Sequence, residues 1–335
     1  MEILISGGAG FIGSTIASAS MDAGHIPIIL DDLSSGAEAF VKDRIFYRGD
    51  VADGELLDLI FHEHPNIETV VHCAASIVVP DSVADPLAYY KNNVSKAIEF
   101  IGHLNRLGCK RMLFSSSASI YGAGEDFTVD ESSSVDPQSP YARTKAMVEV
   151  ILADAAQAGM VSSLSLRYFN PVGADPQRRT GQQRRRPTHA LGKLLEAYNE
   201  GVPFTITGVD WPTRDGSAIR DYIHVWDLAW AHVRALERFD RIVAAENGYA
   251  AINLGTGRGT TVRELVDIFQ LAAGDSLEIS EGPPRQGDVV GSYTRVEKAE
   301  SLLAWRAQLS IADAVRDALA WSSMRDDVLR NSLGT

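Results

Sequence analysis

The sequence predicts an α/β protein: a Rossmann-like doubly wound parallel sheet with a smaller C-terminal substrate-binding lobe. Three observations lead to this class. Short apolar runs alternate with longer amphipathic runs through the first half of the chain, and such alternation produces a parallel sheet covered by helices. A glycine-rich turn follows the first apolar run, and an acidic residue follows the second. Of the 335 residues, 45% are hydrophobic and 22% are charged, as in globular proteins.

Six apolar runs are predicted as strands and three amphipathic runs as helices. Ligands of such sheets bind at the carboxyl ends of the strands, near the reversal in strand order, so we expect the functional residues there. The predicted strands cover residues 2–6, 26–30, 44–48, 69–73, 111–115 and 163–167. The predicted helices cover residues 10–23, 86–107 and 141–158.

The regular alternation ends near Asn170, where prolines and glycines mark an irregular stretch. We expect residues 1–170 to form a Rossmann-like domain and residues 171–335 to form mainly a smaller lobe that closes over the cleft. Residues 220–257 are expected to pack back onto the first domain, with 252–254 returning to the main sheet as a strand.

Composition excludes several classes of function. The formal net charge of −13 argues against general nucleic-acid binding, which depends on Lys and Arg. No apolar run approaches the roughly 18 residues of a membrane span, and neither a signal peptide nor a metal site is expected. Two cysteines, Cys73 and Cys109, cannot form a disulfide framework, which fits a reducing cytoplasm.

A local basic cluster stands out in this acidic chain. Charge runs of this kind usually form solvated loops. The alternative is a loop that attracts a pyrophosphate or a phosphorylated partner. The cluster consists of Arg178, Arg179, Arg184, Arg185 and Arg186.

A glycine-rich turn lies where the first strand becomes a helix. Gly7 can turn the chain sharply, Gly10 lets the backbone approach a pyrophosphate, and Gly13 lets the helix pack closely on the strand. Free amides at the start of the helix then face the phosphates. Asp31 follows the second strand and can accept hydrogen bonds from the ribose hydroxyls of NAD, while it repels the 2′-phosphate of NADP. Alone, these residues also suit an ordinary turn.

Tyr141 and Lys145 are four residues apart on a predicted helix, so their side chains share one face. A free tyrosine has a pKa of about 10 and is a poor base at neutral pH. A nearby ammonium group and the positive nicotinamide ring would favour the phenolate. Ser117 ends a strand on the cleft side, where its hydroxyl could bond a reacting sugar oxygen. Beside a nucleotide-binding turn, this pattern indicates acid–base chemistry coupled to hydride transfer.

The chain resembles the extended short-chain dehydrogenase/reductases, and among them the UDP-galactose (UDP-glucose) 4-epimerase family, almost from end to end. RYFNPVGA and RDYIHV carry much more specific information than the glycine turn. The segments that carry the resemblance are GGAGFIGS at 7–14, DDLSSG at 31–36, YYKNNV at 89–94, FSSSASIYG at 114–122, PYARTKAMVE at 140–149, LRYFNPVGADP at 166–176, RDYIHVWDLA at 220–229, NLGTGRGTTV at 253–262 and PRQGD at 284–288.

The resemblance implies a tightly bound, reused NAD and a UDP-sugar whose C4 is inverted through a 4-keto intermediate. Tyr141 would take the 4′-hydroxyl proton, Lys145 would hold the phenolate and the nicotinamide ribose, and Ser117 would orient the hydroxyl. The implied cofactor contacts are Gly7, Gly10, Phe11, Ile12, Gly13, Asp31, Asp32, Ser35, Gly36, Asp50, Val51, Cys73, Ala74, Ala75, Asn92 and Tyr168. The implied substrate contacts are Ser117, Tyr141, Asn170, His189, Arg220, Tyr222, Arg285, Asp288 and Ser292. Relatives pair through helices at about 86–107 and 141–158, which implies a homodimer.

Three departures from the family pattern matter. Many members carry a lysine near the NAD phosphates where this chain has Ile77. Many carry an Asn pair and an apolar residue where this chain has Thr188, His189 and Ala190. The position seven residues beyond Arg285 limits the space around the sugar's 2-substituent, and here it is the small Ser292. We therefore expect UDP-N-acetylglucosamine and UDP-N-acetylgalactosamine to be interconverted as well as, or instead of, UDP-glucose and UDP-galactose.

Two alternatives compete with this interpretation. A nucleotide-sugar 4,6-dehydratase, or a related reductase, shares the fold, but dehydratases place an acidic pair directly after the active-site serine or threonine. This chain has Ala118 and Ser119 there, which argues against dehydration. A non-catalytic NAD-binding sensor should have a broken catalytic triad, whereas the triad is intact in this sequence.

Overall fold

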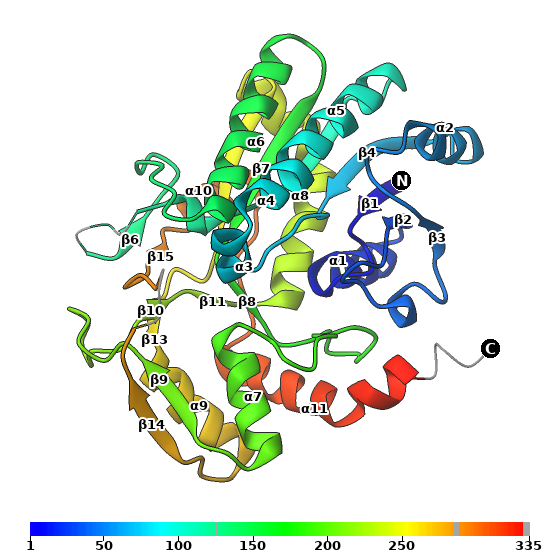
Figure 1. Cartoon of the computed structure of the whole chain (residues 1–335). Helices are drawn as coiled ribbons and strands as arrows, with labels where there is room; N and C mark the ends of the chain where they lie inside the picture. The colour runs from blue at the N-terminus through cyan, green and yellow to red at the C-terminus, as the bar shows by residue number, and fades with distance from the viewer. Residues whose placement is uncertain (123, 125, 285–287, 331–335) are drawn as a thin grey trace.

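The computed structural model describes residues 1–122, 124, 126–284 and 288–330. A seven-stranded sheet forms its centre, in the order β12-β7-β5-β4-β1-β2-β3 with all neighbouring strands parallel (Figure 1). The strand order reverses between β1 and β4, as in a doubly wound sheet. The six predicted strands are confirmed, and the segment expected to return to the sheet forms β12. The strands are β1 (Glu2–Ser6), β2 (Ile26–Asp31), β3 (Ile45–Arg48), β4 (Ile67–His72), β5 (Arg111–Ser117), β7 (Ser162–Tyr168) and β12 (Tyr249–Leu254).

Helices cover both faces of this sheet, and each face has its own hydrophobic core. Side chains of one strand alternate between the faces: Ile3 and Ile5 belong to one cluster and Leu4 to the other. The Ile3 cluster packs against α1 (Phe11–Asp22) and α8 (Val225–Ala245). The Leu4 cluster packs against α2 (Gly54–Glu63), α5 (Lys96–Arg106) and α6 (Pro140–Gln157).

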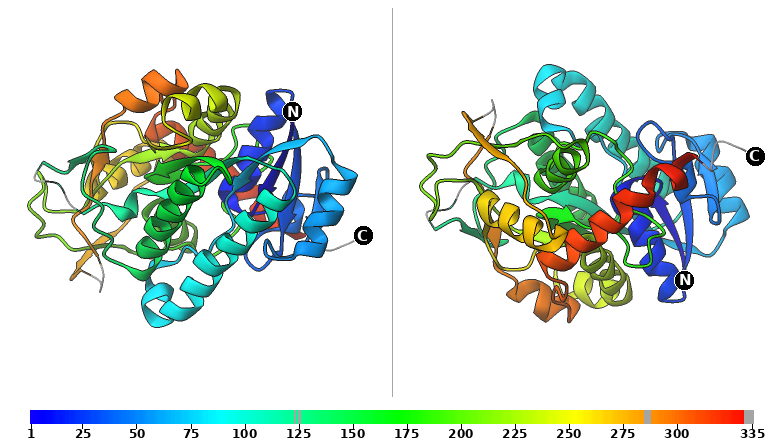
Figure 2. Two further views of the ribbon diagram at one scale, coloured as in Figure 1. Left: turned by 90° about the horizontal axis from the view of Figure 1, so that it is seen from above. Right: turned by 90° about the horizontal axis from the view of Figure 1, so that it is seen from below.

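A smaller lobe packs below the carboxyl edge of the sheet (Figure 1, and from below in Figure 2). Its own core joins α7 (Ala190–Glu200), α9 (Val262–Ala273) and α11 (Ile311–Arg330) to the parallel pair β9 (Phe204–Thr207) and β14 (Ile279–Gly282). Short elements complete the chain: β6 (Thr128–Val129), β8 (Asn170–Val172), β10 (Ile219–Arg220), β11 (Tyr222–His224), β13 (Thr260–Thr261), β15 (Tyr293–Thr294), α3 (Val79–Ala84), α10 (Glu297–Leu303), η1 (Glu38–Phe40) and η3 (Ala118–Ile120). Within the described ranges, no helix combines the length and apolarity that a membrane crossing requires.

The predicted helix over 86–107 is interrupted. It consists of α4 (Pro86–Tyr90), a π-helical segment η2 (Lys91–Ser95) and then α5. π-helical turns are rare and are found mostly at functional sites. Here the wider turn contains Asn93, whose buried amide bonds the backbone of Ser76 at 2.8 and 2.9 Å and the hydroxyl of Thr144 at 3.1 Å. The interruption therefore connects the end of β4 to α6.

A buried ion pair ties α6 to the sheet. The Arg167 guanidinium on β7 donates to the Glu149 carboxylate on α6, at 3.0 Å from Nε and 2.5 Å from Nη2. Both side chains are less than a tenth exposed. Ser116 Oγ on β5 donates to the same carboxylate, and Arg167 Nη1 donates to Tyr121 Oη at 2.7 Å. Each charge is thus compensated, as buried charges must be.

We expect Arg167→Met to lower the free energy of unfolding by about 3–5 kcal/mol, because it leaves the buried Glu149 carboxylate without its cation. Urea unfolding at a fixed cofactor concentration measures the change. Arg234→Met is the matched control: Arg234 pairs with Glu237 at 2.8 Å on the surface, so its loss should cost less than about 1 kcal/mol.

The double variant Arg167→Met/Glu149→Met separates the ion pair from simple packing. It also removes the unpaired Glu149 carboxylate, so it should recover part of the stability lost in the single variant. Strictly additive losses in the double variant would contradict a role for charge pairing.

Candidate functional site

Five strand ends meet at one edge of the sheet and bring the predicted site residues together. The parallel register places Ser6 beside both Leu30 and His72, and His72 beside Phe114. At the far end of β5, Ser117 is level with Tyr168 of β7. The residues that follow or end these strands therefore surround one cleft, on the side of the sheet where such folds bind ligands.

The glycine turn forms a tight cradle at the start of α1. A Cβ at Gly7, where φ is +71°, would lie 2.6 Å from the Ala74 backbone nitrogen, and one at Gly13 would lie 2.3 Å from the Gly7 carbonyl oxygen. A Cβ at Gly10 would meet only the Gly7 oxygen, at 3.4 Å. Within the described structure, no side chain caps α1, so its first amides, including those of Phe11 and Ile12, remain available to an anion. The cradle fits the pyrophosphate of a dinucleotide.

Asp31 connects this turn to the loop that follows β2. Its Oδ2 accepts from the Ala9 amide at 3.0 Å and its Oδ1 from the Leu33 amide at 2.8 Å. Burial raises its pKa, against the effect of these two hydrogen bonds. Each oxygen keeps a second lone pair, which a ribose hydroxyl can use. Gly36 is required at the closure of the loop, because a Cβ there would lie 2.9 Å from Asp31 Oδ1.

Four further predicted cofactor contacts lie in this loop or follow the next strand, β3. Asp32 and Ser35 are exposed, whereas Val51 is buried. Asp50 accepts from the Ala52 amide at 3.0 Å and from Lys96 Nζ at 2.5 Å. Asp32 and Ser35 belong to the loop after β2, and Asp50 and Val51 follow β3.

Tyr141 lies in the first turn of α6, facing the end of β5. Ser139 caps this helix by accepting from the Ala142 amide at 3.2 Å, and Pro140 occupies its first turn. Proline is favoured there because it needs no hydrogen-bonded N–H. Burial raises the pKa of Tyr141 to about 12, and the nearby Ser117 side chain opposes this rise. The structure thus brings Tyr141 and Ser117 close together.

Lys145 lies one helical turn further along and is buried. Its Nζ donates to the Ser115 carbonyl oxygen at 2.7 Å and lies 4.8 Å from the centre of the Phe114 ring. The distance from Nζ to the centre of the Tyr141 ring is 6.0 Å. Burial lowers the pKa of Lys145 to about 8. A cation held this close to the phenol favours its deprotonated form.

The end of β4 forms the wall opposite the Asp31 loop. Cys73 Sγ lies 3.1 Å from Ser115 Oγ, and burial raises the pKa of this thiol to about 11. Ala74 and Ala75 follow, half-buried. Asn92 Nδ2 donates to Ser76 Oγ at 3.1 Å. The neighbouring Asn93, which the sequence did not single out, makes the stronger set of contacts to this wall.

The small lobe contributes Arg220 from β10. Its Nη1 donates to the carbonyl oxygens of Ile219 at 2.7 Å and Val290 at 2.8 Å. Gly291 is required by this arrangement, because a Cβ there would lie 1.9 Å from Arg220 Nη1. Arg220 thus holds the segment that carries Asp288 and Ser292. Arg285 lies outside the described residues.

The remaining predicted substrate contacts differ in their surroundings. His189 caps α7 through Nδ1, which accepts from the Gly192 amide at 3.1 Å; burial lowers its pKa to about 4. Asn170 heads β8, which pairs in parallel with β11 beginning at Tyr222. The Tyr222 side chain is buried, and within the described structure its hydroxyl has no hydrogen-bond partner. Burial raises the pKa of Tyr168 well above the usual value, and the nearby Ser115 side chain opposes this rise.

Asp221 is a further organising residue of the site. It is fully buried and accepts from the Thr256 amide at 2.8 Å, the Gly257 amide at 3.1 Å and the Thr294 amide at 3.3 Å. It thereby joins the loop after β12 to β15, beside Arg220. The sequence placed Asp221 in the segment RDYIHV without a role, because its partners are far along the chain.

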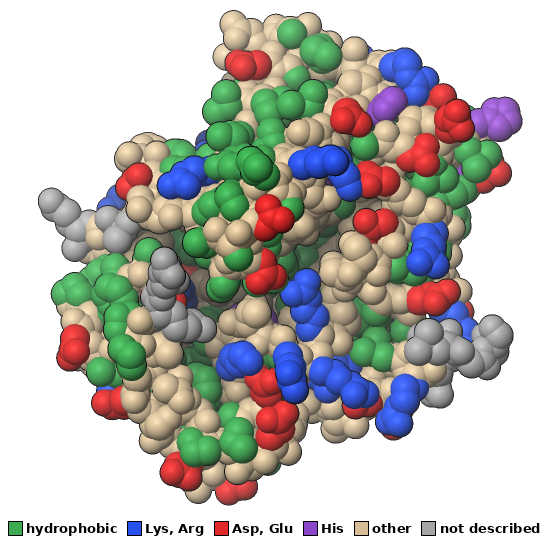
Figure 3. All heavy atoms as spheres, in the orientation of Figure 1, with side chains coloured by type: hydrophobic (Ala, Val, Ile, Leu, Met, Phe, Trp, Pro, Cys, Tyr) green, Lys and Arg blue, Asp and Glu red, His purple; other side chains and the backbone are tan. Residues whose placement is uncertain are grey.

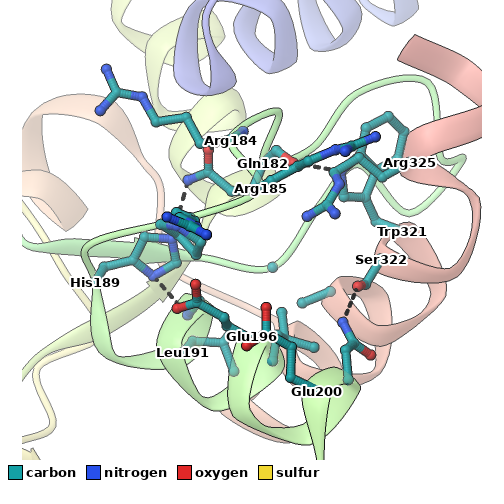
Figure 4. Close-up of a pocket in the computed structure, with 17 residues that line it drawn as sticks. Gln182, Arg184, Arg185, His189, Leu191, Glu196, Glu200, Trp321, Ser322 and Arg325 are labelled. Carbon is teal, nitrogen blue, oxygen red and sulfur yellow. Dashed lines mark hydrogen bonds between the residues drawn. The ribbon is translucent and has the colours of Figure 1, made fainter. Parts of the chain in front are cut away.

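A separate cavity of about 300 Å³ lies between α7, α11 and the basic loop (Figure 4). Leu191, Leu195 and Trp321 are among the residues that line it. Arg184 is also among the lining residues, and its side chain extends outward from the loop in Figure 4. The catalytic pair on α6 is not among its lining residues.

Comparisons with known proteins agree with this geometry. Residues 3–255 match the model of the NAD dependent epimerase/dehydratase family. A UDP-glucose 4-epimerase of Azospirillum brasilense is 38% identical over 323 residues, which cover 96% of this chain and 91% of that protein. The crystal structure of a UDP-glucose-4-epimerase from Stenotrophomonas maltophila, with bound NAD and formylated UDP-arabinopyranose, has a TM-score of 0.91, 33% identity and coverage of 98% of this chain and 99% of that one.

A third similar protein acts on two classes of sugar. The UDP-Glc/GlcNAc 4-epimerase of Campylobacter jejuni has a TM-score of 0.81 and 32% identity, and the match covers 96% of this chain and 99% of that chain. The family model spans most of the chain, and the relatives match it nearly from end to end. The chain therefore belongs to the NAD dependent epimerase/dehydratase family.

Proposed function

We propose that this chain is an NAD-dependent UDP-sugar 4-epimerase that acts by transient oxidation to a 4-keto sugar. The observation that carries the proposal is the placement of Tyr141, close to Ser117 and one turn from Lys145, at the sheet edge that also holds the glycine cradle. The similar epimerases of A. brasilense and S. maltophila support the same reaction.

We propose that the two parts of the chain divide the binding task. Residues 1–170, with 220–257 packed against them, hold NAD, and residues 171–335 hold mainly the UDP-sugar. Gly10 and the amides of α1 face the pyrophosphate, while Asp31 bonds the adenosine ribose. The remaining proposed cofactor contacts are Gly7, Phe11, Ile12, Gly13, Asp32, Ser35, Gly36, Asp50, Val51, Cys73, Ala74, Ala75, Asn92 and Tyr168.

Tyr141 acts in this mechanism as the acid–base group for the sugar hydroxyl. Its phenolate removes the proton from the 4′-hydroxyl, and its phenol returns a proton after C4 has been inverted. Burial opposes the phenolate, so the nearby ammonium of Lys145 must offset that cost. Ser117 orients the hydroxyl toward Tyr141. The glycine cradle and Asp31 would hold NAD, which would supply the acceptor and donor of the C4 hydride and a positive charge that favours the phenolate.

In this proposal the small lobe binds the nucleotide and the diphosphate of the substrate. Arginine suits a diphosphate because its planar guanidinium can bond two oxygens at once. Arg220 lies in the described part of this lobe, and Arg285 is proposed by resemblance alone. The other proposed substrate contacts are Asn170, His189, Tyr222, Asp288 and Ser292.

A nucleotide-sugar 4,6-dehydratase remains the alternative with the same cofactor. Elimination of water requires an acid and a base near the sugar's C5 and C6. Ala118 and Ser119 follow Ser117 in the short helix η3, and neither can act as a carboxylic acid. The absence of an acid at this position of the sequence favours epimerisation. Turnover of UDP-glucose to UDP-galactose, without formation of a 4-keto-6-deoxy product, distinguishes the two.

We infer that two copies of the chain pair through α4, α5 and α6, where several large apolar side chains point to solvent. Leu87 on α4 is 76% exposed, Ile98 on α5 is 51% exposed and Val150 on α6 is 62% exposed. Exposed apolar groups gathered on neighbouring helices mark an interaction surface.

We also infer a cytoplasmic location, because Cys73 and Cys109 are both free thiols. Cell fractionation tests this inference.

Tyr141→Phe should lower kcat by about 10²- to 10⁴-fold, because only the acid–base hydroxyl is lost. NAD content and the KM for UDP-glucose should remain near those of the wild type. Tyr198→Phe, whose ring packs on Phe269 in the small lobe, is the control and should keep full turnover. Near-complete epimerisation by Tyr141→Phe would show that the phenol is not the base.

Lys145→Met tests the electrostatic part of the mechanism through a pH profile. Activity in the wild type should rise with pH as the phenol loses its proton. Removal of the ammonium raises the pKa of Tyr141, so the same rise should occur at higher pH in the variant. A profile of unchanged midpoint and lower amplitude would contradict this role.

Val150→Asp should weaken dimerisation by at least about tenfold, because it buries a charge in the proposed interface. Analytical ultracentrifugation over a concentration series measures the dissociation constant. Leu271→Asp is the control: Leu271 is 86% exposed on α9, outside the proposed interface. A monomeric wild type, or equal effects of the two variants, would refute the assignment.

Ser292 sets the room around the sugar's 2-substituent in our proposal, so both hexose and N-acetylhexosamine pairs should be interconverted. The C. jejuni enzyme, named for Glc and GlcNAc substrates, supports such dual use within the fold. Ser292→Tyr should lower kcat/KM for the N-acetyl pair by about 10- to 100-fold through steric exclusion while sparing the hexose pair. Ser292→Ala is the control. Equal losses for both classes, or no wild-type activity on the N-acetyl pair, would rule out this gate.

A further inference from the structure

The basic loop, residues 175–187, crosses the seam between the two parts of the protein, and we call it the strap. Thr180 Oγ1 lies 3.1 Å from Thr15 Oγ1 on α1, and Gln183 Nε2 donates to the Ser35 carbonyl oxygen at 2.8 Å. From the other side, Trp321 Nε1 on α11 donates to the Gln182 carbonyl oxygen at 3.0 Å. In Figure 1 the strap is the green loop that passes between α1 and α11.

The arginines of the strap differ in how their charges are compensated. Arg179 bonds Asp22 at 2.7 Å and Asp175 at 2.5 Å, and Arg185 pairs with Asp326 at 3.0 Å. Arg184 is half-buried, yet among the ion pairs of the described residues none includes it. A half-buried guanidinium that has no acidic partner is available to bind an anion such as a phosphate.

The neighbours of Arg184 place it over the cleft. On one side, Gln183 is bonded to Ser35 in the loop after β2. On the other side is Tyr89: burial raises the pKa of this phenol, and the positive charge of Arg184 acts against that rise. Tyr89 Oη donates to the Val78 carbonyl oxygen at 2.6 Å. Arg184 therefore lies next to the residue that is bonded to the loop after β2, and its charge reaches Tyr89 of α4, which is bonded to Val78 after β4.

The rest of the cradle offers little positive charge from side chains. Residues 73–77 of the opposite wall contain neither Lys nor Arg, and Ile77 is 52% exposed. Arg44 is engaged beneath α1, where its Nη1 donates to the Ser14 carbonyl oxygen at 2.8 Å. Backbone amides alone would leave a pyrophosphate with two uncompensated charges. Figure 3 shows Lys and Arg side chains gathered over the strap and α11.

Resting on the proposed function, we propose that Arg184 closes over the cradle and binds the NAD pyrophosphate from the open side of the cleft, so that the strap retains the cofactor between turnovers. A guanidinium can bond two phosphate oxygens in parallel, which adds both energy and orientation. Retention suits a reaction in which the same hydride is removed and returned. The strap, which belongs by sequence to the substrate half, thus completes the cofactor site of the other half.

The test compares NAD binding in Arg184→Gln, Arg184→Lys and the control Arg186→Gln. Arg186 is an exposed neighbour in the same strap, so its variant makes the same change in net charge. Nucleotide released by denaturation is identified and counted per protomer, and stripped protein is titrated with NAD. We expect wild-type protein to release NAD rather than NADP. Arg184→Gln should raise the dissociation constant for NAD about tenfold or more, Arg184→Lys should raise it less, and Arg186→Gln should leave it unchanged.

Equal NAD affinity in wild type and Arg184→Gln would overturn the proposal. If the KM of that variant for UDP-glucose were also raised, Arg184 would instead serve the substrate's diphosphate. Failure of the proposed function is a distinct result: wild-type protein would then bind no NAD, or would bind NAD and fail to interconvert any UDP-sugar.

Discussion

The parallel hydrogen bonding of the central sheet is the constraint on which the rest of the structure depends. Because all seven strands run in the same direction, the ends of β1, β2, β4, β5 and β7 open onto one edge. A glycine turn, an acid, a wall of small residues and a serine come together there although they are far apart in the chain. An antiparallel connection at any of these strands would carry its terminal residues to the opposite edge.

Helix α6 converts this common edge into a reactive site. Its first turns present Tyr141 and Lys145 to the cleft, while Glu149, one turn further, is paired with Arg167 in the sheet. Thr144, between the two reactive residues, accepts from Asn93 of the π-helical segment. The helix is therefore fixed both to the sheet and to the wall after β4. Such fixation keeps two buried titratable groups at constant separation, which an acid–base mechanism requires.

The second half of the chain completes the site through contacts that cross long sequence distances. Asp221 gathers the amides of two separate loops, and Arg220 holds the segment of Asp288 and Ser292 by its backbone carbonyls. The strap joins α1 to α11 across the seam. The two parts of the protein are thus joined by polar contacts, whose loss would displace the segments that they hold.

The sequence by itself determined the sheet and its strands, the glycine cradle, the acid after β2 and the Tyr141–Lys145 pair, because each of these follows from local spacing and residue type. Only the tertiary structure decided the π-helical interruption at Asn93, the burial of Glu149 with Arg167 and the collision that makes Gly291 necessary beside Arg220. It also decided that two arginines of the basic run, Arg179 and Arg185, pair with acids, while Arg184 is half-buried. The physical reason is that solvation and pairing of a side chain depend on partners that folding brings from elsewhere in the chain, and local sequence carries no record of them.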